Sequence, residues 1–185
     1  MTNLLVLIDE DDNEIGTMDK LAAHEQGLLH RAVSVVLFQK ENPELVLIQQ
    51  RAAEKYHCPL LWANTCCSHP YPGEAPVDAA YRRVVEELDF ALPPDTLVPA
   101  GTYKYRAQVG DLVEHEITHV FTGYISKETD IPLNPKEAAA AEWLPAAALP
   151  KRSYAPWMNG VIEKALAALR VPAVPQKEKV TCGRS

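Results

Sequence analysis

Apolar residues in this chain fall mostly into short runs rich in β-branched and aromatic residues, separated by turns of Asp, Asn, Gly and Pro. Such runs predict β-strands over residues 4–8, 32–39, 45–50, 97–108 and 113–125. The acidic segment 9–16 and the turns at 41–43 and 110–111 have the composition of hairpin connections. Residues 59–67 predict a loop or an irregular strand. The pattern therefore predicts a sheet with several hairpins.

Helical periodicity is clearest over residues 75–88, where one face is expected to carry an apolar stripe of Ala79, Ala80, Val84 and Leu88. Residues 20–25 predict a helical turn, and residues 156–169 predict a final helix with Pro near its first turn. Residues 137–145 are ambiguous, because the alanine run favours a helix whereas Trp143 and Leu144 suit a strand. Residues 171–185 carry no pattern and are expected to form a flexible tail beyond a domain of residues 1–170.

Composition narrows the class of protein. The 185 residues suit one domain, and 47% hydrophobic and 23% charged residues are ordinary for a globular protein. A net charge of −7 argues against a nucleic-acid partner, although a local basic pocket is still possible. No apolar run is long enough to span a bilayer, and a signal peptide is not recognisable. A cytoplasmic protein that does not enter the membrane is expected, and no obligate protein partner is evident.

The four cysteines are Cys58, Cys66, Cys67 and Cys182, and they make a poor disulfide framework because the neighbours 66 and 67 would bridge only with strain. A buried thiol is by default a small apolar residue. Cys67 differs from the others because it lies two residues before His69 and close to the start of the helix at 75–88. A thiol in that place is suited to acid–base chemistry.

The helical segment also carries a charge pattern. From residue 68 the chain reads Ser68-x5-Glu74-x7-Arg82-Arg83-Val84-x-Glu86-Glu87-x-Asp89-Phe90. This pattern resembles the Nudix box, in which a loop and helix present carboxylates to magnesium on a diphosphate. Ser68 and Asp89 replace two glycines of the box, and Arg83 replaces a metal-binding glutamate. An arginine offers donors to phosphate oxygens where a glutamate would bind metal, so holding a diphosphate is favoured over cutting it.

A second cluster of polar residues lies on the predicted strand 113–125. Glu114 and Glu116 are two residues apart, so both side chains are expected on one face, where they would repel unless a cation or proton lies between them. His24, His30 and His69 are candidates to complete a mixed imidazole–carboxylate metal site. His115 and His119 fall on the opposite face of the strand.

Taken together, these motifs resemble the type I isopentenyl-diphosphate delta-isomerases. The resemblance rests on Asn64-x-x-Cys67-x-His69-Pro70, the altered Nudix box, Tyr105-Arg106 and Glu114-x-Glu116, with Lys20 and Ala22-Ala23-His24 before them, Arg51 with Lys55, and Pro156-Trp157-Met158 near the end. It extends in the right order from about residue 4 to about residue 169. Cys66, Ser68, Asp89 and His119 depart from the family pattern, and none of them removes a family catalytic group.

The resemblance implies an α/β (α+β) fold, a Nudix-like mixed sheet flanked by helices in a single domain. It also implies interconversion of isopentenyl diphosphate and dimethylallyl diphosphate by protonation and deprotonation. The implied catalytic residues are Cys67, Glu116 and Tyr105, with the direction of proton transfer left open. The implied metal ligands are His24, His30, His69, Glu114 and Glu116 for a divalent metal (Mn²⁺, Mg²⁺ or Zn²⁺), and Glu87 for a diphosphate-bound Mg²⁺. The implied substrate-binding residues are Lys20, Arg51, Lys55, Arg83 and Trp157.

Two other functions are compatible with parts of the pattern. A Nudix pyrophosphohydrolase acting on a nucleotide would explain the box, but Arg83 and the segment from Cys67 to His69 do not suit it. A metal-binding regulatory module would explain the histidines, but it would leave Tyr105 and Trp157 without a role. The isomerase hypothesis accounts for more of these residues than either alternative.

Overall fold

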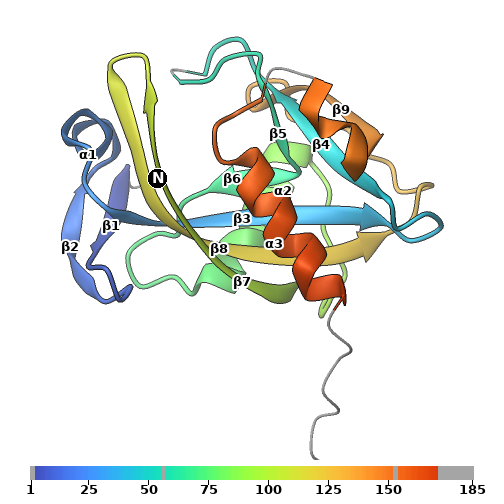
Figure 1. Ribbon diagram of the computed structural model, residues 1–185, viewed down its shortest axis with the longest axis horizontal. Helices are drawn as coiled ribbons and strands as arrows, with labels where there is room; N and C mark the ends of the chain where they lie inside the picture. Colours follow the sequence, from blue (N-terminus) through green and yellow to red (C-terminus); the bar gives the residue numbers. More distant parts are fainter. Residues whose placement is uncertain (1–2, 56, 152–153, 171–185) are drawn as a thin grey trace, which may run out of the picture.

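The computed structural model describes residues 3–55, 57–151 and 154–170, and these form a mixed sheet with helices on its two faces (Figure 1). The strands are β1 (Leu4–Ile8), β2 (Glu14–Asp19), β3 (His30–Gln39), β4 (Leu45–Arg51), β5 (Trp62–Asn64), β6 (Cys66–Ser68), β7 (Val98–Val109), β8 (Leu112–Ile125) and β9 (Ala138–Pro145). The helices are α1 (Lys20–Gln26), α2 (Pro76–Leu88), α3 (Met158–Arg170) and the 3₁₀ turn η1 (Ala146–Lys151).

The centre of the sheet is β3, which pairs in parallel with β8 and antiparallel with β1, β4 and β6. The long hairpin of β7 and β8 extends one side, and β9 pairs antiparallel with β4 on the other. The described strands therefore combine parallel and antiparallel pairs, as the predicted mixed sheet requires.

Alternate residues of β3 enter two separate cores, because successive side chains of a strand point to opposite faces. Val33, Val35 and Leu37 pack with α2 in one core. Val36 and Phe38 pack with α3 in the other. Both faces of β3 are thus buried, which explains its nearly continuous apolar sequence.

Most predicted elements are present with small shifts at their ends. Helix α2 buries the predicted stripe of Ala79, Ala80, Val84 and Leu88. The ambiguous segment 137–145 is a strand, β9, because it pairs with β4 along its whole length. The segment 59–67 contains two three-residue strands, β5 and β6, and the final helix begins at Met158, after Pro156. The predicted tail, 171–185, lies outside the described residues.

Candidate active site

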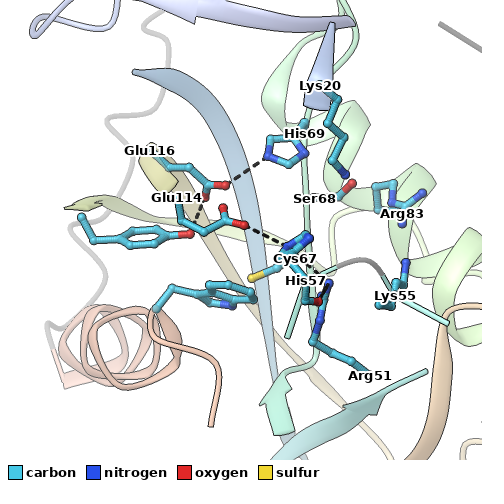
Figure 2. Close-up of a pocket in the computed structure, with 12 residues that line it drawn as sticks. Lys20, Arg51, Lys55, His57, Cys67, Ser68, His69, Arg83, Glu114 and Glu116 are labelled. Atoms are coloured by element: carbon cyan, nitrogen blue, oxygen red, sulfur yellow. Dashed lines mark hydrogen bonds and ion pairs between the residues drawn. The ribbon is translucent and has the colours of Figure 1, made fainter. Parts of the chain in front are cut away.

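A cavity lies where β6, β7 and β8 meet the loop after β4 and the start of α1 (Figure 2). It is lined by Lys20, Arg51, Lys55, His57, Cys67, Ser68, His69, Arg83, Tyr105, Glu114, Glu116 and Trp157. Figure 2 shows Glu114 and Glu116 on one side of this pocket and Lys20, Arg83 and Lys55 on the other. The sequence-predicted catalytic and substrate-binding residues therefore all line one cavity.

Strand pairing brings the chemical groups together. Glu116 of β8 lies opposite His30 in the β3–β8 pair and opposite Tyr105 in the β7–β8 pair. Cys67 lies opposite Ser34 in the β3–β6 pair. These residues are fixed by the backbone register and not by loops, so the positions of this carboxylate, phenol, thiol and imidazole follow directly from the sheet.

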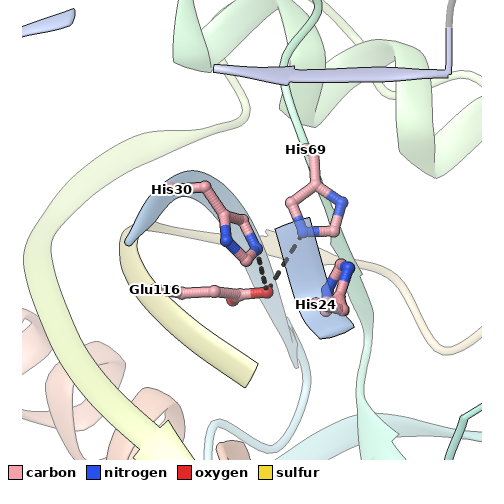
Figure 3. Close-up of side chains that lie close together, drawn as sticks. All are labelled: His24, His30, His69 and Glu116. Atoms are coloured by element: carbon pink, nitrogen blue, oxygen red, sulfur yellow. Dashed lines mark hydrogen bonds and ion pairs between the residues drawn. The ribbon is translucent and has the colours of Figure 1, made fainter. Parts of the chain in front are cut away.

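Four side chains from separate elements form a candidate metal site: His24, His30, His69 and Glu116 each offer an atom, and these atoms lie within 4.8 Å of one another (Figure 3). The Nδ1 atoms of His24 and His30 contact the carbonyl oxygens of Lys20 and Leu28, at 2.6 and 2.8 Å. Nδ1 therefore carries the proton in each ring, and the Nε2 lone pair faces the cluster. This arrangement is typical of metal-binding histidines, so the residues fit a divalent metal.

Glu114 lies at the edge of this cluster. Its Oε2 is 3.4 Å from His24 Nε2, and its Oε1 is 2.9 Å from His57 Nε2. Burial and the charge of Glu116 would raise the pKa of Glu114, but contacts with His24 and His57 outweigh them and lower it. Glu114 is therefore ionised and able to serve as a ligand.

Glu116 has contacts on both of its oxygens. Oε1 is 3.1 Å from His69 Nε2 and 3.4 Å from His30 Nε2, and Oε2 accepts a hydrogen bond of 2.7 Å from the Tyr105 hydroxyl. Burial alone would raise the pKa of Glu116, but interaction with His30, followed by Glu114 and Tyr105, lowers it to about 2. Burial and the adjacent Glu116 raise the pKa of Tyr105 well above its usual value, so the phenol keeps its proton.

The Cys67 thiol is held between two polar side chains. Its sulfur lies 2.8 Å from Ser34 Oγ and donates to Asn64 Oδ1 at 3.0 Å, while Thr118 donates to Ser34 Oγ at 3.1 Å. Burial raises the pKa of Cys67 to about 12, against the opposing effect of these hydrogen bonds. The thiol is therefore protonated in the free protein while Glu116 is ionised.

The neighbouring Cys66 points to the other face of the sheet and packs in the core under α2. Burial raises the pKa of this thiol well above the usual value, and the side chain is fully enclosed. Cys66 is thus a structural residue, as Cys58, buried in the α3 core, also is. Cys182 lies outside the described residues.

The cationic end of the cavity is built around Arg83. Its guanidinium contacts Glu86 at 2.5 Å, Glu87 at 2.7 Å and Glu137 at 3.1 Å, and Lys55 also pairs with Glu137. Lys20 joins this end from α1, where burial and then the charges of Lys55 and Arg83 lower its pKa to about 8. Lys20, Lys55 and Arg83 thus bring positive charge to one end of the cavity in a chain of net charge −7, and such a pocket suits a small anionic ligand.

Glu87 is not part of the histidine cluster. It is buried on α2, where Oε1 accepts from Arg83 and Oε2 accepts from Gln49 at 2.6 Å. A Mg²⁺ ion bound to Glu87 would therefore share the carboxylate with Arg83 and Gln49 or displace one of them.

Arg51 and Trp157 lie next to each other in the lining of the cavity. The Arg51 guanidinium lies 5.6 Å from the centre of the Trp157 ring, within cation–π range. The same indole lies 6.1 Å from Tyr105 and is almost completely buried. Trp157 therefore closes the apolar side of the cavity next to the acid–base pair.

Three contributors were not singled out from the sequence. His57 contacts Glu114, Ser34 contacts the Cys67 sulfur, and Glu137 pairs with both Lys55 and Arg83. His57 and Glu137 lie in loops without periodicity, so no pattern marked them. His115 and His119 lie away from the cluster, where His115 contacts the Gly27 carbonyl and His119 contacts Asp12.

Comparison with known proteins identifies the class of fold and then the family. The NUDIX domain family model matches residues 28–165, which include the sheet centre, α2 and most of the cavity, and the chain belongs to this family. Within it, the chain belongs with the proteins named isopentenyl-diphosphate Delta-isomerase. The enzyme of Streptomyces coelicolor is 44% identical over 174 residues, covering 90% of this chain and 85% of its own. That of Pectobacterium atrosepticum is 45% identical over 141 residues, covering 75% and 74%.

Solved structures agree on the fold. A crystal structure from Deinococcus radiodurans superposes with a TM-score of 0.71 at 16% identity, covering 88% of this chain and 98% of the other. The MutT protein of Methanosarcina mazei gives 0.62 at 17% identity, covering 77% and 96%. At these identities the likeness concerns the fold alone, and it confirms the predicted Nudix-like single domain.

Proposed function

We propose that this protein is an isomerase that interconverts isopentenyl diphosphate and dimethylallyl diphosphate, the reaction named for its relatives. The observation that carries the proposal is a single cavity with a thiol and a carboxylate at one end and clustered cations at the other. A substrate with an anionic head and a short hydrocarbon tail matches this division.

The reaction adds a proton to the terminal alkene carbon and removes one from the carbon on the other side of the resulting tertiary cation. The enzyme therefore needs one protonated and one deprotonated group facing the same hydrocarbon. Two properties of the free protein support the proposal: burial raises the pKa of Cys67 to about 12, and contacts with His30 lower the pKa of Glu116 to about 2. Of Cys67 and Glu116, one donates the proton and the other accepts one, and the two roles exchange when the reaction runs in reverse. Tyr105 is hydrogen-bonded to the Glu116 carboxylate.

His24, His30, His69, Glu114 and Glu116 would hold a divalent metal, Mn²⁺, Mg²⁺ or Zn²⁺. Such an ion supplies positive charge that orients the Glu116 carboxylate and adjusts its basicity. Mg²⁺ carried by the diphosphate would use Glu87 once Arg83 has moved to the phosphate oxygens. In both sites the protein supplies hard oxygen or imidazole ligands, which suit these ions.

Lys20, Arg51, Lys55 and Arg83 would bind the diphosphate, and Trp157 would face the cationic intermediate. A desolvated cation–π contact is worth about 2 kcal/mol or more. A positioned general acid or base contributes about 10²–10⁴-fold to the rate. Substitution of Cys67 or Glu116 should therefore reduce turnover more than substitution of Trp157 does.

The deciding experiment incubates the protein with Mg²⁺ and isopentenyl diphosphate and measures both the dimethylallyl isomer and free phosphate. Isomer without phosphate is the expected result. Phosphate without isomer would instead support a Nudix pyrophosphohydrolase acting on a nucleotide, and neither product would support a metal-binding module. No helix among the described residues is both long and apolar enough to cross a bilayer.

A further inference from the structure

His57 lies in the loop between β4 and β5 and lines the cavity beside Glu114 (Figure 2). Its side chain is 8% exposed, and its Nε2 is 2.9 Å from Glu114 Oε1. This separation is that of a charge-assisted hydrogen bond. The contact connects a loop residue to a strand residue of the candidate metal site.

The two oxygens of Glu114 face two different imidazoles. Oε1 faces His57, and Oε2 lies 3.4 Å from His24 Nε2, on the side of the metal cluster. A carboxylate anchored through one oxygen cannot rotate freely about its last bond. The contact with His57 thus fixes the plane of the Glu114 carboxylate and holds its second oxygen on the side of His24.

His57 is also tied to the substrate side of the cavity. Arg51 Nη2 donates to the His57 carbonyl at 3.2 Å. The His57 ring stacks with that of His24 at 5.8 Å between centres and lies 6.2 Å from that of Trp157. The residue after it, Cys58, has a φ of 48°, so the loop holds a backbone conformation that side chains rarely adopt.

We infer that His57 is a positioning residue that donates Nε2–H to Glu114 Oε1, turns Oε2 toward the metal, and links the Arg51 loop to the metal site. The inference rests on the proposed function, because it assigns His57 a part in the same site. His57 acts through Glu114, whose Oε2 lies 3.4 Å from His24 Nε2 at the edge of the cluster, whereas the His57 Nε2 atom faces Glu114 Oε1. The four side chains whose ligand atoms lie within 4.8 Å of one another are His24, His30, His69 and Glu116.

Residues that orient a metal ligand typically change metal affinity or activity by about 10–100-fold when removed. The expected signature is therefore weaker metal binding and a lower kcat, with a smaller change in KM. A residue that bound only the diphosphate would instead raise KM and leave metal affinity unchanged.

The test titrates metal-free wild type, His57→Ala and His57→Gln with Co²⁺ and follows the visible absorption bands of the bound ion. His57→Ala should raise the Co²⁺ dissociation constant by about 10–100-fold and alter the band shape. His57→Gln, whose amide can still donate to Glu114, should recover most of the affinity. His119→Gln is the matched control, because His119 contacts Asp12 outside the cluster. Circular dichroism of each variant verifies the fold.

Wild-type Co²⁺ affinity in His57→Ala would overturn the inference, and unchanged Co²⁺ affinity together with a raised KM would assign His57 to the substrate instead. Equal losses in His57→Ala and His57→Gln would also overturn it, because a donor at this position would then not matter. Failure of the proposed function is distinguishable: wild type that binds Co²⁺ but makes no dimethylallyl isomer would refute the isomerase proposal and leave the metal-positioning result standing.

Discussion

Arg83 offers the sharpest test of how a Nudix box can hold a diphosphate without cutting it. Its guanidinium is 16% exposed and contacts Glu86, Glu87 and Glu137. Arg83→Met removes the positive charge that these three carboxylates share. Breaking a buried ion pair by removing one partner costs about 3–5 kcal/mol. Only Glu87 is buried here, and Glu86 and Glu137 are 29% and 22% exposed, so this variant should lose less, about 1–3 kcal/mol.

Arg83→Glu should be less stable still in the absence of metal, because four carboxylates then repel one another. Mg²⁺ should restore part of the loss in Arg83→Glu and little in Arg83→Met, since clustered carboxylate oxygens bind this ion. At a concentration about 100 times the dissociation constant the gain is about 2.7 kcal/mol. Both variants should also lose about 10–100-fold in kcat/KM, as removal of charge-assisted hydrogen bonds worth about 1.5–3 kcal/mol predicts.

The assay is urea unfolding followed by circular dichroism, with and without Mg²⁺, together with isomer and phosphate measurements. Arg82→Met is the control, because Arg82 pairs with Glu74 and Glu86 on the same helix but does not line the catalytic cavity. Stability of Arg83→Met equal to wild type would refute the reasoning. So would an Arg83→Glu variant whose unfolding is insensitive to Mg²⁺.

Four further outcomes are expected. Cys67→Ala should lower turnover about 10²–10⁴-fold with the fold intact, whereas Cys66→Ala should retain turnover. Steady-state kinetics measures the turnover of both variants, and circular dichroism verifies their fold. Exhaustive chelation should abolish isomer formation, and activity that survives would contradict the metal site. The pKa of Lys20 is lowered to about 8, so its charge is lost as pH rises through that value. KM for the diphosphate substrate should therefore increase above about pH 8, as steady-state kinetics at a series of pH values will measure. Lys20→Arg, which keeps its charge, should remove this rise. Gly160→Ala would place a Cβ 2.2 Å from the ring of Tyr103, which stacks on Tyr105, so a lower Tm and kcat are expected, with about 1–3 kcal/mol of destabilisation.

The sequence predicted those helices and strands that have a clear hydrophobic pattern in their own residues. The apolar stripe of α2 and the runs that form β3, β4 and β8 are local patterns, and the structure contains them. The segment 137–145 could not be assigned, because its alanines favour a helix and only pairing with β4 makes it a strand. Tertiary contacts can override local propensity in this way.

The candidate site was predictable to a similar extent. The sequence spacing identified two pairs of candidate residues, because the members of each pair are two positions apart: Cys67 with His69, and Glu114 with Glu116. His57 and Glu137 act on residues more than fifty positions away, and nothing in their local sequence indicates a role. Glu87 was expected to bind a Mg²⁺ ion on the diphosphate; its contacts with Arg83 and Gln49 depend on the fold and could not be predicted from the sequence.

The two ends of the cavity are built from different parts of the fold, and this division has consequences for mutation. Cys67, Glu116 and Tyr105 lie on strands paired through β3 or β8, and a one-residue slip of β8 would turn Glu116 to the other face, where His115 now lies. Their geometry therefore depends on sheet register, which a buried core on both faces enforces. The cations instead come from the start of α1, the middle of α2, the end of β4 and the loop after it, so their positions depend on several separate elements. Changes in these segments should alter KM first, whereas changes in the packing of β3 and β8 should reduce kcat and stability together.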